Sequence, residues 1–394
     1  MNIRNFNDLK QYVSENKDVK RCMVRCDLNL PSDIEDLTRI HSIKDTVHEL
    51  LSLGLDVILI SHYKRPKLED VIDPKYSLKN IVEKVSNVLQ IDVSFVKYSV
   101  FDIQPSDITS KVTLFENLRF YEGETKNDEE LARRLAKFAD IYINDAFSVS
   151  HRAHASVSKI TEFLPSFAGL SLEREINGIT KVTNNIEKPF TAIIGGSKVS
   201  SKIGVLNHIS KTANYLIITG AMANTFLASQ GVDLQNSLVE PDQFNLCREI
   251  LQNSKAEIIL PVDFIASNSI SVDGSNYSLD KIPDGFSCFD IGEKSTANVV
   301  EILGKTRTLL WNGATGAFEF ANFNRSSNII SEAIAEKTKA KDMISVVGGG
   351  ETVASIGGYK NDMTFVSTAG GAFLEFVTGD ELPGIICLSL VSKN

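Results

Sequence analysis

The sequence predicts an α/β protein whose parallel sheets are covered by helices on both faces. Short β-branched runs alternate along the chain with amphipathic stretches, which is the pattern of strand–helix units in such sheets. The chain has 394 residues, and at about 100–200 residues per domain this length favours two domains. Hydrophobic residues make up 43% and charged residues 23%, which excludes the disordered and fibrous classes.

The apolar runs are the candidate strands. In the first half they are Cys22–Leu30, Val57–Ser61, Val112–Phe115 and Ile141–Asn144. In the second half they are Phe190–Ile194, Tyr215–Thr219, Glu257–Val262, Thr308–Trp311, Met343–Val347 and Thr364–Ser367. Asp128–Phe138 and Gln243–Asn253 are examples of the amphipathic stretches. Apolar residues at helical spacing over 170–185 predict a helix between the two domains.

Composition and charge exclude several classes of function. The net charge is −9, from 41 basic and 50 acidic residues, which argues against a broad surface for nucleic acid or an anionic membrane. No apolar run approaches the roughly 18 residues of a membrane span, and the first residues lack the apolar block of a secretory signal. The five cysteines are scattered without a C-x-x-C pair, which is typical of a reducing cytosol and predicts neither disulfides nor a zinc site.

Positive charge follows each candidate strand of the first half. The arginines concerned are Arg39, Arg65, Arg119 and Arg152. Ligands of open parallel sheets bind beyond the carboxyl ends of the strands, and a guanidinium group matches a phosphate or carboxylate bidentately. Together they predict a site for a small, multiply charged acid. For any one arginine alone, a surface ion pair is the better interpretation.

Glycine-rich turns and two lysines follow strands of the second half. If a helix begins at the first turn, Lys198 and Lys202 share a face, where two cations near a helix N-terminus predict a neutralising anion. Two separate, solvated lysines are the alternative. The turn Gly348–Gly350 exposes backbone N–H groups suited to a phosphate, or is simply a tight connection. Glu319 follows a third turn, as a ribose ligand or an ordinary surface acid.

Eight segments of the chain resemble phosphoglycerate kinase in order and spacing. They lie at 24–31, 61–66, 116–121, 144–147, 151–156, 198–204, 311–313 and 348–352. The resemblance covers essentially the whole chain, and it is the ordered set that makes it specific.

The resemblance implies two Rossmann-like, doubly wound parallel-sheet domains facing a central cleft. Residues 1–169 would bind the triose acid, 170–185 would form the interdomain helix, 186–380 would bind the nucleotide, and 381–394 would return to the first domain. The implied activity is that of glycolysis and gluconeogenesis, the reversible, Mg²⁺-dependent phosphoryl transfer between 1,3-bisphosphoglycerate and ADP that gives 3-phosphoglycerate and ATP. The implied enzyme is a cytoplasmic monomer with small-molecule partners and no nucleic-acid or membrane partner.

The resemblance also implies roles for individual residues. The triose acid would be held by Asp27, Asn29, Arg39, His62, Arg65, Arg119 and Arg152. ATP or ADP would be held by Gly195, Lys202, Gly220, Asn312, Glu319, Gly349, Gly350, Glu351 and Thr352, with the adenine between the turns near Gly195 and Gly220. Glu351 would be the protein's Mg²⁺ ligand. Arg39 and Lys198 would be catalytic and stabilise the phosphoryl group in flight.

This inventory of cations fits the chemistry. The attacking phosphate or carboxylate oxygen is already ionised at neutral pH, so the reaction needs charge neutralisation rather than a general base. Closure of the domains would bring the two substrates in line.

Three departures from the family pattern leave an alternative open. Glu351 replaces an aspartate, Ala369 a glycine and Phe373 a small residue beside a phosphate-facing turn. The alternative is a catalytically weakened nucleotide-binding scaffold of the same fold. A nicotinamide-dependent dehydrogenase is a weaker alternative, because the chain lacks G-x-G-x-x-G with a following acid.

Overall fold

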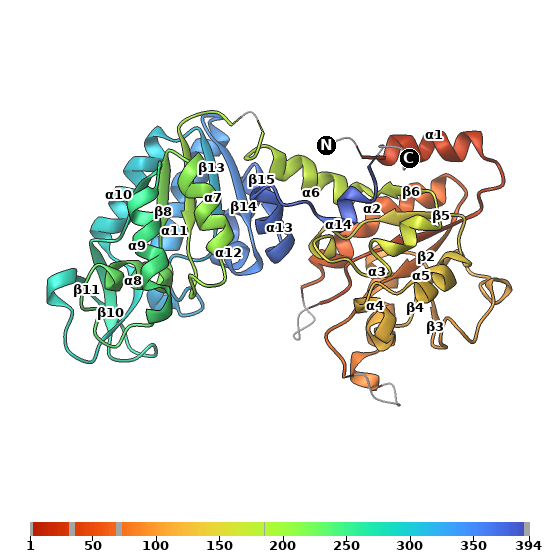
Figure 1. The fold of residues 1–394 in the computed structure, drawn as a ribbon, viewed down its shortest axis with the longest axis horizontal. Coiled ribbons are helices and arrows are strands. Elements are labelled where there is room, and N and C mark those ends of the chain that lie inside the picture. The colour runs from red at the N-terminus through yellow and green to blue at the C-terminus, as the bar shows by residue number, and fades with distance from the viewer. Residues whose placement is uncertain (1–2, 31–35, 68–72, 185, 390–394) are drawn as a thin grey trace. The chain divides into compact units, whose positions relative to one another are not determined.

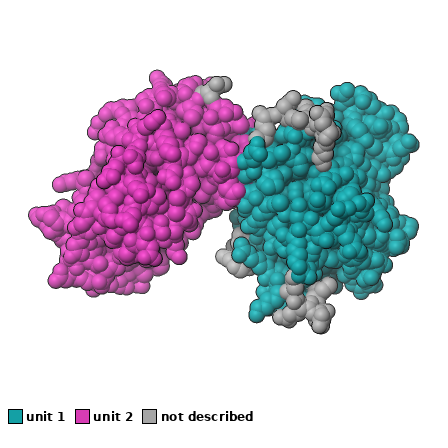
Figure 2. All heavy atoms as spheres, in the orientation of Figure 1, with its two compact units in different colours: residues 1–176, 381–394 teal, residues 177–380 magenta. Residues whose placement is uncertain are grey.

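The computed structural model describes residues 3–30, 36–67, 73–184 and 186–389 and divides into two compact units. Unit 1 comprises residues 1–176 and 381–394, and unit 2 comprises residues 177–380 (Figure 2). Within the described ranges, no helix combines the length and the apolar character needed to cross a membrane.

Unit 1 is built on a six-stranded parallel sheet of order β3-β4-β2-β1-β5-β6 (Figure 1). Its strands are β1 (Arg21–Arg25), β2 (Asp56–Ile60), β3 (Ser94–Val96), β4 (Val112–Phe115), β5 (Ile141–Asn144) and β6 (Ser166–Ala168). Its helices are α1 (Phe6–Glu15), α2 (Thr38–Ser52), α3 (Val82–Leu89), α4 (Glu122–Thr125), α5 (Glu129–Ala136) and α14 (Pro383–Ile386). The centre of the sheet therefore lies at β2 and β1.

Successive residues of β1 belong to two different cores, one on each face of the sheet. Cys22 and Val24 pack into a cluster with the apolar side chains of α2 and α3, while Met23 packs into a second cluster with those of α5. Both faces are buried because side chains alternate along a strand. This explains why the strands read as continuous apolar runs.

The last described residues of the chain belong to unit 1. The Gly384 N–H donates to Ser150 O at 2.8 Å, and Asn144 Nδ2 donates to Gly384 O at 2.8 Å. A Cβ atom at position 384 would lie 2.7 Å from a Val157 methyl carbon and 2.9 Å from Ser150 Cα. Only glycine fits this close approach of two backbones.

Helix α6 (Leu170–Thr180) carries the chain out of unit 1. Its first turn is capped by the buried Asp145, whose Oδ1 accepts hydrogen bonds from Ser171 N at 2.8 Å and Leu172 N at 3.1 Å. A carboxylate at a helix N-terminus satisfies N–H groups that have no partner within the helix.

Unit 2 is built on a second six-stranded parallel sheet, of order β15-β14-β13-β7-β8-β9. Its strands are β7 (Phe190–Ile194), β8 (Tyr215–Ile218), β9 (Glu257–Ile259), β13 (Thr308–Asn312), β14 (Ile344–Gly348) and β15 (Phe365–Ser367). Its helices are α7 (Ile203–Thr212), α8 (Gly220–Ser229), α9 (Phe244–Asn253), α10 (Glu293–Lys305), α11 (Arg325–Lys339), α12 (Gly350–Ser355) and α13 (Gly370–Val377). Helices α7, α8, α9 and α13 form one contacting group, and α10 pairs with α11 (Figure 1).

Unit 2 also contains a small antiparallel sheet that the sequence pattern does not predict. Its strands are β10 (Asp263–Ser267), β11 (Ser275–Ser278) and β12 (Ser287–Ile291), in the order β11-β10-β12. Elsewhere the predicted α/β class with parallel sheets is confirmed, and β4, β5 and β7 have the predicted bounds. The run from Cys22 ends at Arg25, because beyond Cys26 the backbone turns and Leu28 N donates to Ser61 Oγ.

Candidate active site

The carboxyl ends of the central strands of unit 1 lie level with one another. Arg25, the last residue of β1, is in register with Ile60 at the end of β2 and with Asn144 at the end of β5. The residues that follow these strands therefore share one edge of the sheet, where ligands of parallel sheets bind.

Asp27 and Arg39 form the first part of the site at this edge. Arg39 Nη1 donates to both carboxylate oxygens of Asp27, at 2.9 and 2.7 Å. The Ser148 hydroxyl donates to Asp27 Oδ2, and Asn29 N donates to Oδ1 at 3.0 Å. The Asn29 Oδ1 accepts the Lys64 N–H at 2.7 Å. Asp27 thus holds the Arg39 guanidinium in place, and Ser148 is a contributor that sequence reasoning missed.

The arginines of unit 1 surround His62 electrostatically. Burial lowers the pKa of His62 well below its ordinary value, and the nearby charges of Arg25, Arg119, Arg152 and Arg39 lower that pKa further. Three of the four predicted arginines, Arg39, Arg119 and Arg152, thus act electrostatically on His62.

The fourth predicted arginine, Arg65, acts electrostatically on Arg119. The pKa of Arg119 is lowered mainly by burial, raised by Glu124, and lowered by Arg152, Arg25 and Arg65. Its Nε is buried and makes no hydrogen bond to any residue that the structure describes. A buried guanidinium donor without a partner, among like charges, is suited to an anionic ligand.

A buried amide joins two of the sequence motifs. Asn117 Oδ1 accepts hydrogen bonds from Tyr63 N at 2.9 Å and Arg119 N at 3.0 Å, and its Nδ2 donates to Tyr63 O at 2.7 Å. Asn117 is fully buried, so these bonds fix the loops that carry His62 and Arg119. The sequence pointed to Asn117 only through its place in the motif at 116–121.

In unit 2 the turns at the strand ends pack directly on one another. Gly195 N donates to Asn312 O at 2.9 Å, and Gly220 N donates to Thr315 O at 3.0 Å. A Cβ at Gly195 would lie 2.2 Å from Ala314 O. Glycine is required here because two backbones touch. The predicted nucleotide residues Gly195, Gly220 and Asn312 are therefore neighbours.

The triple-glycine turn at 348–350 is hydrogen-bonded to the turn that follows β13. Asn312 Nδ2 donates to Gly348 O at 2.6 Å, and Thr352 Oγ1 accepts the Gly313 N–H at 2.6 Å. Gly349 has φ +96°, and a Cβ there would lie 2.8 Å from Asn312 Nδ2. The Oδ1 atom of Asn312 is buried without a hydrogen-bond partner in the described structure, which leaves an acceptor for a ligand.

Lys202 lies against the same turns. Its Nζ donates to Gly195 O at 2.7 Å and to Asn312 O at 3.3 Å. Burial lowers the pKa of Lys202 to about 8, and the nearby Glu351 carboxylate raises that pKa. The ammonium group is thus held by carbonyl dipoles at the centre of the turns.

The expectation that Lys198 and Lys202 share a helix face is wrong. Helix α7 begins at Ile203, with Lys202 as its N-cap residue, so Lys198 lies in the preceding loop, where its side chain is exposed. Before the helix, Ser200 bonds to Glu240 and the Lys202 side chain bonds to the carbonyl groups of the turns. Glu319 is also exposed, and within the described ranges no hydrogen bond or ion pair links it to the glycine turns.

The residues beside the turns fit a magnesium ion bound through a nucleotide. Glu351 lies exposed in the first turn of α12. Mg²⁺ in such sites takes one or two carboxylates together with phosphate oxygens and water. Among the described residues there is no cluster of three or more metal-binding side chains.

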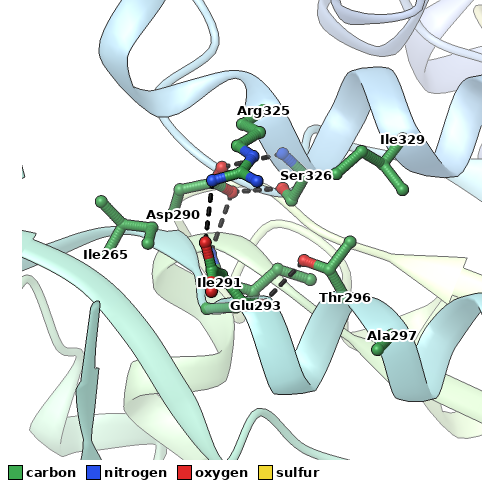
Figure 3. Close-up of a pocket in the computed structure, with 10 residues that line it drawn as sticks. Ile265, Asp290, Ile291, Glu293, Thr296, Ala297, Arg325, Ser326 and Ile329 are labelled. Carbon is green, nitrogen blue, oxygen red and sulfur yellow. Dashed lines mark hydrogen bonds and ion pairs between the residues drawn. The ribbon is translucent and has the colours of Figure 1, made fainter. Parts of the chain in front are cut away.

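The buried carboxylate of Asp290 holds the turn that follows β13. Asp290 accepts hydrogen bonds from the Ser326 hydroxyl, from Ser326 N at 3.2 Å and from Ile291 N at 2.9 Å (Figure 3). The Thr315 hydroxyl lies 2.6 Å from the Ser326 hydroxyl, and a Cβ at Gly316 would lie 2.4 Å from Asp290 Oδ1. Burial raises the pKa of Asp290 to about 7. Asp290 thus caps α11 and holds the turn after β13.

Asp290 also lines a cavity of about 250 Å³. Its other walls include Ile265, Ala297 and Ile329, and the ion pair between Arg325 and Glu293, at 2.8 Å, lies beside it (Figure 3).

Comparison with known proteins connects both sites to one family. The family model for phosphoglycerate kinase matches residues 13–380. The phosphoglycerate kinases of Brucella melitensis and Rhizobium meliloti are each 40% identical to this chain over 380 residues, which are 93% of this chain and 96% and 95% of theirs.

Solved structures agree with the sequence match. The phosphoglycerate kinase of Coxiella burnetii superposes with a TM-score of 0.83 at 31% identity, covering 98% of this chain and 97% of the other. That of Pyrococcus horikoshii superposes with a TM-score of 0.80 at 28% identity, covering 94% and 96%. The edge of the unit 1 sheet with its arginines and the glycine turns of unit 2 are thus features of a chain that belongs to the phosphoglycerate kinase family.

Proposed function

We propose that this phosphotransferase of glycolysis, whose acceptor is a carboxyl group, binds its triose acid at the arginine cluster of unit 1 and ADP or ATP at the glycine turns of unit 2. The carrying observation is the cluster itself, in which Arg25, Arg39, Arg119 and Arg152 all act on His62. Asp27 and Glu124 offset part of this positive charge, and an anionic ligand would neutralise the rest. A molecule with one phosphate and one carboxylate supplies that negative charge.

In the ATP-consuming direction, a carboxylate oxygen of 3-phosphoglycerate forms a bond to the γ-phosphorus of ATP. The bond from that phosphorus to the β,γ-bridging oxygen breaks, and its electron pair leaves with ADP. No proton moves, because the attacking oxygen is already ionised. The transition state is loose and metaphosphate-like, so the task of the protein is to position the reactants and neutralise charge.

Residues of the two candidate sites would position the reactants and neutralise their charge. Asp27 holds the Arg39 guanidinium through two hydrogen bonds, and Arg119 offers an Nε donor that has no partner among the described residues. Lys202 and the N–H groups of 350–352, in the first turn of α12, would hold the phosphates. Lys198, whose side chain is exposed, would neutralise the phosphoryl group in flight. Mg²⁺, held by Glu351, would neutralise charge on the phosphate oxygens.

The bulk of Phe373 does not argue for a catalytically weakened scaffold. Its side chain is fully buried, and a Cβ at Gly348 would lie 2.3 Å from its ring. Phe373 therefore fills space beneath the turn and supports it. Ala369 is also buried, with its N–H donated to Ser367 Oγ at 3.2 Å.

The test is turnover of 3-phosphoglycerate with MgATP, with and without a chelator, and in the ATP-forming direction. We expect ADP formation that depends on both 3-phosphoglycerate and free Mg²⁺. Nucleotide binding without turnover in either direction would instead establish the scaffold.

We further propose that the enzyme is a cytoplasmic monomer. None of the five cysteines, all of which lie in the described ranges, forms a disulfide, and four of them are buried, as expected in a reducing compartment. Light scattering on the purified protein at micromolar concentration tests the oligomeric state, for which a mass near 43.4 kDa is expected.

A further inference from the structure

A chain of buried hydrogen bonds leads from an acidic residue on α4 to His62. The carboxylate of Glu124 accepts the Ser156 hydroxyl at 2.7 Å and the Ser156 N–H at 3.0 Å. The Ser156 hydroxyl in turn accepts the Nε–H of Arg25 at 3.0 Å, and Arg25 Nη2 lies 3.1 Å from Nδ1 of His62. We call these four residues the relay.

The relay is closed to solvent. Glu124, Ser156 and Arg25 are 0% exposed and His62 is 4% exposed. The remaining Nη1 of Arg25 donates to Cys26 O. An arginine without solvent needs a counter-charge and acceptors for its donors, and Glu124, through Ser156, supplies the charge. The Arg25 side chain is therefore held in one orientation.

This orientation dictates the state of the His62 ring. A guanidinium group has donors only, so the ring nitrogen that faces it must be an acceptor. Nδ1 of His62 then carries no proton, and the proton of the neutral ring lies on Nε2. Burial and the charges of Arg25, Arg119, Arg152 and Arg39 lower the pKa of His62 in the same sense.

We propose that Glu124 and Ser156 are positioning residues, which hold Arg25 so that its guanidinium fixes His62 as the neutral tautomer with its proton on Nε2. His62 then offers an anionic ligand an uncharged N–H donor. The opposite tautomer would present a lone pair of Nε2 to that anion, which is repulsive. The inference rests on the proposed function in one respect, that His62 contacts the triose acid.

His154 lies close to the relay without joining it. Its Nδ1 is 3.8 Å from Glu124 Oε1, beyond hydrogen-bond distance. Burial and the charges of Arg119 and Arg25 lower the pKa of His154 to about 3. The carboxylate of Glu124 is therefore left to Ser156 and, through it, to Arg25.

The first test is nitrogen NMR of the ligand-free protein labelled with ¹⁵N-histidine, because two-bond correlations distinguish a protonated from an unprotonated ring nitrogen. We expect His62 to show an unprotonated Nδ1 and a protonated Nε2 from pH 8 down to pH 5.5. A cationic ring at pH 7, or a proton on Nδ1, would overturn the proposal whatever the enzyme's activity.

The second test is Ser156→Ala, with Ser158→Ala as the matched control. The Ser158 hydroxyl is in the same loop but donates to Asn127 Oδ1 at 3.1 Å, outside the relay. Without the Ser156 hydroxyl we expect mixed His62 tautomers, a higher pKa of His62, and a KM for 3-phosphoglycerate raised about tenfold with the KM for ATP unchanged. We expect the control to match the wild type in all of these.

Each outcome separates the two proposals. If Ser156→Ala leaves the tautomer and the KM for 3-phosphoglycerate unchanged, the relay is refuted while the proposed function stands. If the tautomer is as expected but the protein neither binds nor phosphorylates 3-phosphoglycerate, the proposed function is refuted. Should Ser156→Ala fail to fold, Glu124→Gln replaces it, because the amide keeps the shape of the carboxylate but loses its charge and one of its two acceptors.

Discussion

The candidate site of unit 1 consists of long charged side chains, and that of unit 2 consists mainly of backbone. In unit 1, arginines gather around His62 and are held by buried polar groups such as Asn117. In unit 2, glycine turns pack on one another around the half-buried ammonium group of Lys202. The first site should therefore depend on charge and orientation, and the second on the shape of the main chain.

The largest effect we expect comes from substitution of Lys198, the exposed lysine before α7. Lys198→Ala should lower kcat by about 10²–10³-fold with a modest change in KM, since it removes charge stabilisation made only in the transition state. Steady-state kinetics in both directions is the measurement. Lys211→Ala on the exposed side of α7 is the control. Wild-type turnover of the Lys198 variant would remove its assigned role.

A second prediction compares the buried carboxylates that cap a helix in each unit. Burial raises the pKa of Asp290 in unit 2 to about 7 and that of Asp145 in unit 1 to about 6, from 3.8. A raised folded pKa means that the folded state binds more protons, so this stability is present below pH 3.8 and is lost as pH rises through the folded pKa. For Asp290 the loss between pH 5 and 8 is on the order of 2–3 kcal/mol.

The measurement is urea unfolding of the wild type, Asp290→Asn and Asp145→Asn across that pH range. Each variant should lose its part of the pH dependence, and Asp145→Asn should lose the part at lower pH. Equal slopes in all three proteins would contradict the prediction.

The third prediction tests the dependence of unit 2 on backbone shape. Gly349→Ala forces a side chain into a φ of +96° and against Asn312 Nδ2, at a cost of about 1–3 kcal/mol. We expect the KM for ATP to rise by about tenfold or more and the KM for 3-phosphoglycerate to stay within twofold. Gly304→Ala in α10, where the new Cβ meets nothing within 4 Å, is the control. A parallel rise in both KM values would show that the two sites are not separately built.

The smallest expected effect is a change in stability when Lys64, a strained residue of unit 1, is replaced. Lys64 adopts φ +56°, a left-handed conformation that costs a non-glycine residue about 1 kcal/mol. Lys64→Gly should therefore stabilise the protein by up to about 1 kcal/mol, as measured by chemical denaturation. Lys64→Ala loses the same side chain but keeps the strain, so it should show no gain. A gain of equal size in both variants would place the effect in the lysine side chain.

The sequence predicts elements well where local pattern and tertiary packing agree. The central strands are apolar on both faces, and β4, β5 and β7 have the predicted bounds. The small sheet was missed because β11, with the sequence Ser-Asn-Tyr-Ser, is half exposed and has no apolar alternation. The pairing of β11 with β10 depends on tertiary packing, which the local sequence does not show.

In the candidate site, too, local sequence pattern predicts some features and tertiary contacts determine others. The motif glycines and arginines are recognisable from sequence order alone. The start of α7 at Ile203 was not, because the residues before it bond to distant parts of the chain, Ser200 to Glu240 and Lys202 to Asn312 O. The relay could not be predicted from the sequence either, because Arg25 and Ser156 are 131 residues apart and no local pattern links them.

The return of residues 381–389 to unit 1 has a consequence for folding. The segment around Gly384 packs against Ser150 and Asn144, so unit 1 is completed only by residues that follow unit 2 in the sequence. Unit 2 is contiguous in sequence and can fold while its neighbour waits. A chain truncated after residue 380 should therefore keep unit 2 resistant to protease, while unit 1 becomes easier to cleave.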